Sequence, residues 1–354
     1  MRLYAIVVLV LWGPAGIPAQ ETPDYLASLQ QGMAAYQSGR LTDAERYLID
    51  GLGMLGEDNV VERASILARL GDVYASKKEY SKAASAFSEG LSVYRRLSNV
   101  NGSALMLHNL AMLDSAQGRN DDALRVLTQV LELLKSAPDA GPTVTIKVLN
   151  ALGVVRYSMG SQDKAETFLN QALQTISRSG VTIDTAKVLY NLGAVYVAQR
   201  NFKKAEDVLK RALQLREAEV GSSNPDLFGM LNGLGFVCLE TKRYTEAETY
   251  YHRALEILSP YSSDYPSSIA RILHALNVTY RKAGRTTESD AALAQAAEIA
   301  RANLDKEPVM AKIVEDYSAM LRKQGKTKEA EELRLQAKRA RAAADLVIRA
   351  NSAF

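Results

Sequence analysis

The 354-residue sequence is poor in the side chains on which most catalytic chemistry depends. It contains a single cysteine, Cys238, and three histidines. One thiol cannot form a disulfide within the chain. The histidines, His108, His252 and His274, lie in separate segments, without partners at the spacing of metal ligands. We therefore expect no metal site, no cofactor and no disulfide framework.

Sequence motifs of enzymatic chemistry are also missing. There is no phosphate-binding loop of the G-x-x-x-x-G-K type, no H-E-x-x-H and no C-x-x-C. A G-x-G-x-x-G occurs at 51–56, but no strand pattern precedes it, so it does not indicate a dinucleotide site. Cys238 lies among apolar residues, which predicts a small buried side chain rather than a nucleophile. The chain is therefore predicted not to be an enzyme.

Strong net charge and long apolar runs are absent as well. The formal net charge of +3 is too small to indicate a nucleic-acid partner. The apolar run at 3–12 is about half of the roughly 20 residues that a membrane-spanning helix needs. It follows Arg2 and precedes a small-residue region ending at Ala19, which is typical of a signal peptide over 1–19. We expect export to the periplasm or beyond without a stable membrane anchor, an uncleaved anchor being the alternative.

What the sequence does contain is a repeat with a period of 39 to 42 residues. Its most regular feature is a small or short polar residue, here called the anchor, which follows Leu in six of eight units. The anchors are Gly32, Gly71, Ala111, Gly153, Gly193, Gly235, Asn277 and Ser318. Twelve residues after each anchor stands Ala, or Ser289 in the seventh unit. A fixed period of this length predicts a solenoid.

Each unit is predicted to form two helices. Apolar residues recur at three- and four-residue steps on both sides of a break seven residues after the anchor. The break carries Gly39, Gly118, Gly160, Gly284 or Gly325, and Lys78, Arg200 or Lys242 in the other units. Glycine suits the left-handed residue that ends a helix. The small residues at the anchor and twelve beyond it are expected to let the two helices of a unit approach closely.

The pattern resembles the tetratricopeptide repeat, whose skeleton appears here as Leu70, Gly71, Tyr74, Ala83 and Phe87. The long period is similar to that of kinesin light chains. The resemblance implies an all-α fold, a right-handed superhelical α-solenoid of about eight helix-turn-helix repeats over 20–340. Residues 341–354 would be the end of a basic capping helix and a tail. Ends that face water are expected in a repeat array.

Arrays of this family bind ligands in a concave groove lined by the first helix of each repeat. At the corresponding positions, cations of repeats four to seven are interspersed with amide, phenol and imidazole groups. We predict a ligand-binding groove made by Lys147, Asn150, Lys187, Tyr190, Asn191, Asn232, Arg271, His274 and Arg281. Such a surface suits an acidic or carboxylate-bearing ligand. Solvated charges on an exposed face are the alternative interpretation.

The sequence thus predicts a non-enzymatic scaffold that binds a protein or peptide, and the cations of the predicted groove favour an acidic one. Two alternatives stay open: a periplasmic component that binds an acidic polysaccharide in an export complex, and a structural subunit that assembles through the ends of the stack. Glu166, Glu206 and Glu248 recur at one position of the repeat, which indicates pairing between repeats rather than an acid–base pair.

Overall fold

The computed structural model describes residues 24–56, 58–137 and 140–351. The predicted signal peptide, 1–19, lies outside these residues. The described chain is all-α, with sixteen α-helices in consecutive pairs, three short 3-10 helices and no strand. It divides after Val93 into two compact units. None of the described helices combines the length and the apolar character that crossing a membrane requires.

The first unit holds repeats one and two. Its helices are α1 (Asp24–Gln37), α2 (Leu41–Gly53), α3 (Val60–Ser76) and α4 (Tyr80–Arg96), the last of which continues into the second unit. Ala35, Leu48 and Ile66 form the centre of a core between the first three helices. Within α3 and α4, Gly71 faces the ring of Phe87.

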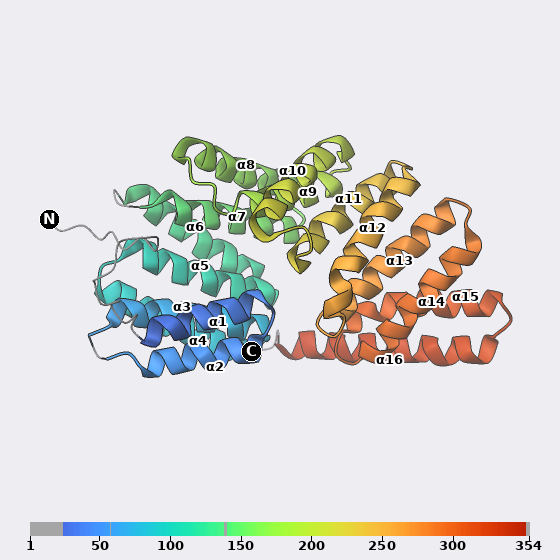
Figure 1. Ribbon diagram of the computed structural model, residues 1–354, viewed down its shortest axis with the longest axis horizontal. Helices are drawn as coiled ribbons and strands as arrows, with labels where there is room; N and C mark the ends of the chain where they lie inside the picture. Colours follow the sequence, from blue (N-terminus) through green and yellow to red (C-terminus); the bar gives the residue numbers. More distant parts are fainter. Residues whose placement is uncertain (1–23, 57, 138–139, 352–354) are drawn as a thin grey trace, which may run out of the picture. The chain divides into compact units, whose positions relative to one another are not determined.

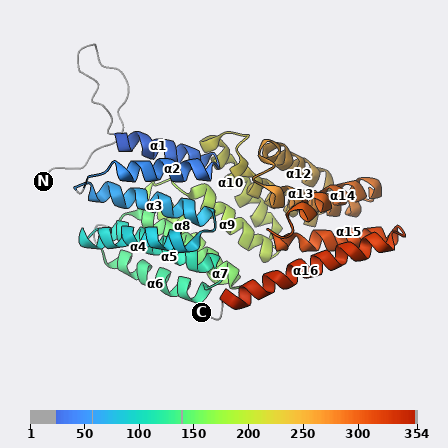
Figure 2. The same cartoon turned by 90° about the horizontal axis from the view of Figure 1, so that it is seen from below.

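The second unit holds repeats three to eight. Its first helices are α5 (Val100–Ala116), α7 (Pro142–Ser158), α9 (Thr185–Ala198), α11 (Phe228–Glu240), α13 (Pro266–Lys282) and α15 (Ala311–Lys323). Its second helices are α6 (Asn120–Ser136), α8 (Gln162–Ser179), α10 (Phe202–Val220), α12 (Tyr244–Leu258), α14 (Thr286–Asn303) and α16 (Thr327–Asn351). Each second helix packs against its own first helix and, where a repeat follows, against the next first helix (Figures 1 and 2).

The first helices of this unit form the tighter of its two layers. Each first helix from α5 to α13 also contacts the first helix of the following repeat. Successive second helices do not approach each other as closely over the described residues. Because one layer is more closely spaced than the other, the first helices occupy the inner side of the stack, as in a tetratricopeptide array.

The glycine anchors leave room for a larger side chain, which belongs to the residue sixteen positions later. A Cβ added at Gly193 would lie 2.6 Å from the side chain of Leu209, and one added at Gly235 would lie 2.5 Å from the ring of Tyr251. Gly32, Gly71 and Gly153 face Leu48, Phe87 and Leu169 in the same way. The small residue twelve positions after each anchor is buried, as predicted. The closest side-chain contact of the glycine anchors, however, is with the larger residue at sixteen.

In two repeats a polar anchor forms hydrogen bonds with the residue twelve positions later. Asn277 Nδ2 donates to Ser289 Oγ at 2.8 Å and to the Ser289 carbonyl at 2.9 Å. Ser318 Oγ donates to the Ala330 carbonyl at 2.6 Å. Ser318 Oγ and Asn277 Nδ2 thus have partners in the buried interface, whereas the buried Asn277 Oδ1 has no hydrogen-bond partner among the described residues.

The predicted breaks between paired helices lie in the left-handed region. The five glycines at this position have φ between +73° and +83°. Lys78, Arg200 and Lys242 adopt the same conformation at φ of +57° to +63°, which is unfavourable for residues with a Cβ. The turn geometry is thus kept in repeats that lack the glycine.

Candidate binding face of the first helices

The inner layer of repeats four to seven is almost free of carboxylates. Its helices α7, α9, α11 and α13 contain one acidic residue, Glu240, against six cations. Those cations are Lys147, Arg156, Lys187, Arg271, Arg281 and Lys282. Glu240 forms ion pairs with Lys282 at 3.1 Å and Arg200 at 3.4 Å. The outer helices of these repeats carry most of the acidic residues, so charge is divided between the two layers.

The structure separates the predicted cations of this face into paired and unpaired groups. Lys147 forms an ion pair with Asp184, just before α9, at 2.9 Å. Lys187, Arg271 and Arg281 are exposed and make no hydrogen bond or ion pair with the described part of the chain. Three cations on α9 and α13 therefore face solvent with no carboxylate of the described chain to neutralise them.

His274 belongs to a separate cluster with repeat eight. Its Nε2 lies 3.0 Å from Asp316 Oδ2, and Lys312 Nζ lies 2.7 Å from Asp316 Oδ1. Asp316 thus offsets the positive charge at this end of the face. The sequence pattern does not predict that Asp184 and Asp316 lie at this face, because the first lies in a linker and the second in repeat eight.

The predicted amides are partly engaged with each other. Asn191 Nδ2 donates to Asn150 Oδ1 at 2.8 Å, which joins α9 to α7. Asn150 is buried and Asn191 is half-buried. Asn232 on α11 is half-buried, and no hydrogen bond joins its side chain to the described residues. The amide pair leaves part of its hydrogen-bonding capacity for a ligand.

The side chain of Tyr190 in repeat five packs over Gly229 in repeat six. A Cβ added at Gly229 would lie 3.0 Å from the Tyr190 hydroxyl. Gly229 stands at the repeat position that carries Lys187 in repeat five and Arg271 in repeat seven. Burial raises the pKa of Tyr190, against the opposing effect of the Arg271 charge. Its phenol therefore stays protonated at neutral pH. It lies over Gly229, at the repeat position that carries a cation in repeats five and seven.

Two exposed aromatic side chains belong to the same helices. Tyr157 on α7 and Phe236 on α11 are each 39% exposed. They stand four residues and one residue after their anchors, at positions that the tetratricopeptide resemblance assigns to the groove. Their place in the repeat is the sequence signal that would identify them, although the predicted groove contains only Tyr190 among the aromatic residues.

His108 lies at the N-terminal edge of this face, on α5. Burial lowers its pKa to about 4, and the positive charges of Lys187 and Lys147 act in the same direction. Its Nδ1 lies 2.9 Å from Asn109 Oδ1. The imidazole is therefore neutral at physiological pH and adds no charge to the face.

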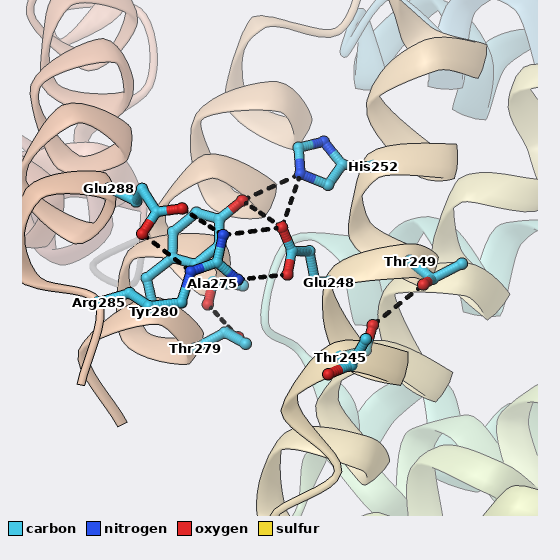
Figure 3. A network of polar contacts seen from close by, with 9 residues as sticks. All are labelled: Thr245, Glu248, Thr249, His252, Ala275, Thr279, Tyr280, Arg285 and Glu288. Carbon is cyan, nitrogen blue, oxygen red and sulfur yellow. Dashed lines mark hydrogen bonds and ion pairs between the residues drawn. The ribbon is translucent and has the colours of Figure 1, made fainter. Parts of the chain in front are cut away.

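Two arginines that directly precede second helices are paired with glutamates of the preceding repeat. Arg243 donates to Glu206 of the preceding repeat at 2.6 Å, and Arg285 donates to Glu248 at 2.7 Å. Figure 3 shows the second contact, where Tyr280 also donates to Glu248 at 3.0 Å. The Arg285 guanidinium, Glu248's strongest partner, lowers the pKa of that carboxyl group. These contacts confirm the predicted pairing of equivalent glutamates between repeats.

Glu166 also contacts the following repeat, but its partner there is uncharged. Its Oε2 accepts from Gln199 Nε2 of the next repeat at 2.9 Å. In the first unit, Glu45 pairs with Lys77 at 2.5 Å at the equivalent position. The contacts of Glu45, Glu166, Glu206 and Glu248 with the following repeats are here called the ladder between repeats. The ladder holds successive repeats in register and accounts for the recurrence of these acidic residues.

Comparison with known proteins agrees with this architecture. The curated protein Kinesin light chain-related 2 from Arabidopsis thaliana is 22% identical over 276 residues, which are 74% of this chain and 42% of that protein. The chain thus spans less than half the length of that relative.

Solved structures show the same fold at low sequence identity. BtubC (BKLC) from P. vanneervenii has a TM-score of 0.56 at 21% identity, covering 63% of this chain and 91% of that one. The Rap conjugation gene regulator of the plasmid pLS20, solved with a bound peptide, has a TM-score of 0.58 at 15% identity. That match covers 92% of this chain and 97% of the regulator.

Sequence models of the tetratricopeptide repeat match most of the described chain, up to residue 302. The matched residues are 24–96, 62–136, 102–178, 144–218 and 226–302. Together with the paired helices, the small anchors and the kinesin-light-chain-like period, these matches show that the chain belongs to the tetratricopeptide repeat family.

Proposed function

We propose that the chain is a non-enzymatic scaffold that binds an extended acidic segment of a protein along the first helices of repeats four to seven. The observation that carries the proposal is the division of charge between the layers. Four successive first helices have six cations and one carboxylate, and only Lys147 and Lys282 have an ion pair in the described chain. The other four are Arg156, whose Nε is buried without a hydrogen-bond partner among the described residues, and the exposed Lys187, Arg271 and Arg281. Unpaired cations next to free amide and phenol groups favour an anionic ligand.

The spacing of the repeats sets the spacing of acidic groups in such a ligand. Adjacent packed helices lie about 8–10 Å apart, so Lys187 and Arg271, two repeats apart, are separated by roughly 20 Å. An extended chain advances about 3.3 Å per residue, so about six residues cover that distance. We expect the ligand to carry carboxylates about six residues apart, with an apolar residue between them near Tyr190 and Phe236.

A peptide series tests this directly. We would measure fluorescence anisotropy of labelled 12-residue peptides with two glutamates three, six or nine residues apart, at 50 and 200 mM NaCl. The six-residue spacing should bind best, and Lys187→Glu with Arg271→Glu should weaken binding by tenfold or more. The matched control is Lys164→Glu with Lys203→Glu, two exposed cations of second helices.

The control pair should leave affinity within about twofold, because it changes the net charge equally but lies on the other layer. The Rap structure with a bound peptide supports the choice of a peptide ligand for this fold. Equal loss in the two charge-reversed pairs would show that attraction to the whole protein, and not this face, governs binding.

An acidic polysaccharide is a second candidate, favoured by the exposed rings of Tyr157 and Phe236. Rings of this kind present apolar faces to sugars while the nearby cations meet uronic carboxylates. Polygalacturonate should then bind in a way that the glutamate peptides fail to displace, and Phe236→Ala should weaken it. Displacement of the polymer by the six-residue-spaced peptide at its own affinity would favour the peptide site.

We also propose that the protein is exported and that residues 1–19 are removed. The short apolar run and the small residues before Gln20 support this proposal. N-terminal sequencing of the protein from its native host should begin at Gln20. A mature chain that begins at Met1 or Arg2 would contradict it.

A further inference from the structure

The last repeat contains a cationic pocket separate from the face described above. It lies between α15 and α16, has a volume of about 610 Å³, and has Ser318 and Ala319 in its lining. Five cations also line it: Arg322, Lys323, Arg334, Lys338 and Arg341. Neither the ladder between repeats nor the proposed peptide site uses this pocket.

The position of the pocket within the repeat identifies what would fill it. Arg334, Lys338 and Arg341 stand sixteen, twenty and twenty-three residues after their anchor, Ser318. The corresponding residues of repeat seven are Leu293, Ala297 and Ala300, and those of repeat three are Leu127, Leu131 and Leu134. All six are buried.

In repeat seven these residues share a core with the next first helix. Leu293, Ala297 and Ala300 cluster with Ala311 and Val314 of α15. The pocket between α15 and α16 is therefore the place where a following first helix would dock, and its apolar residues have been replaced by cations. Among the described residues, no helix covers it.

The charges around the pocket are only partly neutralised. Arg341 pairs with Glu315 at 2.8 Å. Glu331 pairs with Arg334 at 2.6 Å and with Arg322 at 3.4 Å. Lys323 and Lys338 have no ion pair with the described residues. Five cations thus face two carboxylates, which leaves a net positive pocket.

We propose that this pocket binds an acidic helix of a partner protein, which docks where the first helix of a further repeat would lie. The shape of the site fits a helix, because the equivalent crevice of every repeat from three to seven holds one. The charge selects an acidic helix, because a partner rich in Glu or Asp would satisfy Lys323 and Lys338. The same cations disfavour a neutral or basic helix such as the chain's own first helices.

The chain itself supplies a matched pair of probes. Helix α13 is a first helix that docks in the crevice between α11 and α12. We would prepare a stapled peptide of residues 266–282 with Arg271→Glu, Arg281→Glu and Lys282→Glu, and the unchanged peptide as the control. Binding to the full chain would be measured by calorimetry in 50 mM NaCl, and located by hydrogen exchange.

The acidic peptide should bind one to one and slow hydrogen exchange in α15 and α16, while the unchanged peptide should bind at least tenfold more weakly. Lys323→Glu with Lys338→Glu should weaken the acidic peptide by tenfold or more. Lys328→Glu with Arg339→Glu alters net charge equally on other exposed positions of α16, and should leave affinity within about twofold. All four lysine and arginine side chains are exposed, so the variants should fold.

Three results would overturn the proposal. The first is protection that appears on α9 and α13 in place of α15 and α16, which would move the peptide to the first-helix face. The second is an equal effect of the two double variants. The third is displacement of the peptide by tripolyphosphate at an affinity that exceeds the peptide's own, since the pocket would then be a site for small polyanions.

Discussion

Replacing the anchor Gly235 with alanine tests how the paired helices pack. The new Cβ would lie 2.5 Å from Tyr251 Cε1 and 2.8 Å from two further ring atoms, and Tyr251 is fully buried. Overpacking of this kind costs about 1–3 kcal/mol. Alanine favours a helix over glycine by about 1 kcal/mol, which offsets part of that cost. We expect a net loss of about 1 kcal/mol in the stability of repeat six.

The assay must resolve single repeats, because a solenoid need not unfold in one step. Hydrogen exchange in α11 and α12 across a urea series gives the local opening free energy. The control is Gly53→Ala at the exposed end of α2, where the added Cβ meets no atom within 4 Å. That substitution should be neutral or stabilising by a few tenths of a kcal/mol.

A double variant tests whether the contact with the Tyr251 ring causes the loss of stability. Gly235→Ala with Tyr251→Leu reproduces the pair Ala111 and Leu127 of repeat three. The double variant should be more stable than the sum of the single changes predicts, by about 1 kcal/mol, because the smaller side chain relieves the clash. Stabilisation by Gly235→Ala alone, or additive effects, would refute the view that ring contact requires glycine here.

Two further predictions concern titratable groups. Burial raises the pKa of the Cys238 thiol to about 11, so iodoacetamide at pH 8 should label it only after unfolding in urea, and rapid labelling of the native protein would contradict its burial. Burial lowers the pKa of His108 from 6.5 to about 4. Between these two pH values the imidazole is protonated in the unfolded chain but not in the folded one. The free energy of unfolding should therefore fall as pH falls from about 6.5 to 4, by up to about 3 kcal/mol. His108→Gln should flatten this part of the pH profile of the urea midpoint, and an unchanged slope would show that other groups cause it.

The sequence predicted the repeat, the helices and their ends with little help from tertiary contacts. The anchors recur at a fixed period, and the helix breaks carry glycine or a residue that adopts the same left-handed conformation. The pairing of equivalent glutamates also followed from their recurrence, as Glu206 and Glu248 show. Such features depend on residues close in the chain or on identical positions in successive units.

The candidate face depended on contacts that the period does not encode. Only the structure joins Lys147 to Asp184 and Asn150 to Asn191, and only it lays Tyr190 over Gly229. Each contact crosses from one repeat to the next, at a place where the two repeats differ in sequence. Which cations stay unpaired was therefore decided by side-chain packing between repeats.

The sequence by itself thus determined a chain of helix pairs with small residues where the helices meet, because helix formation and pairing are local and repeat every 39 to 42 residues. The tertiary structure decided which charges remain available. Stacking brings side chains from different repeats to within hydrogen-bonding distance, and the free cations are those, such as Lys187 and Arg271, that this stacking leaves without a carboxylate in the described chain.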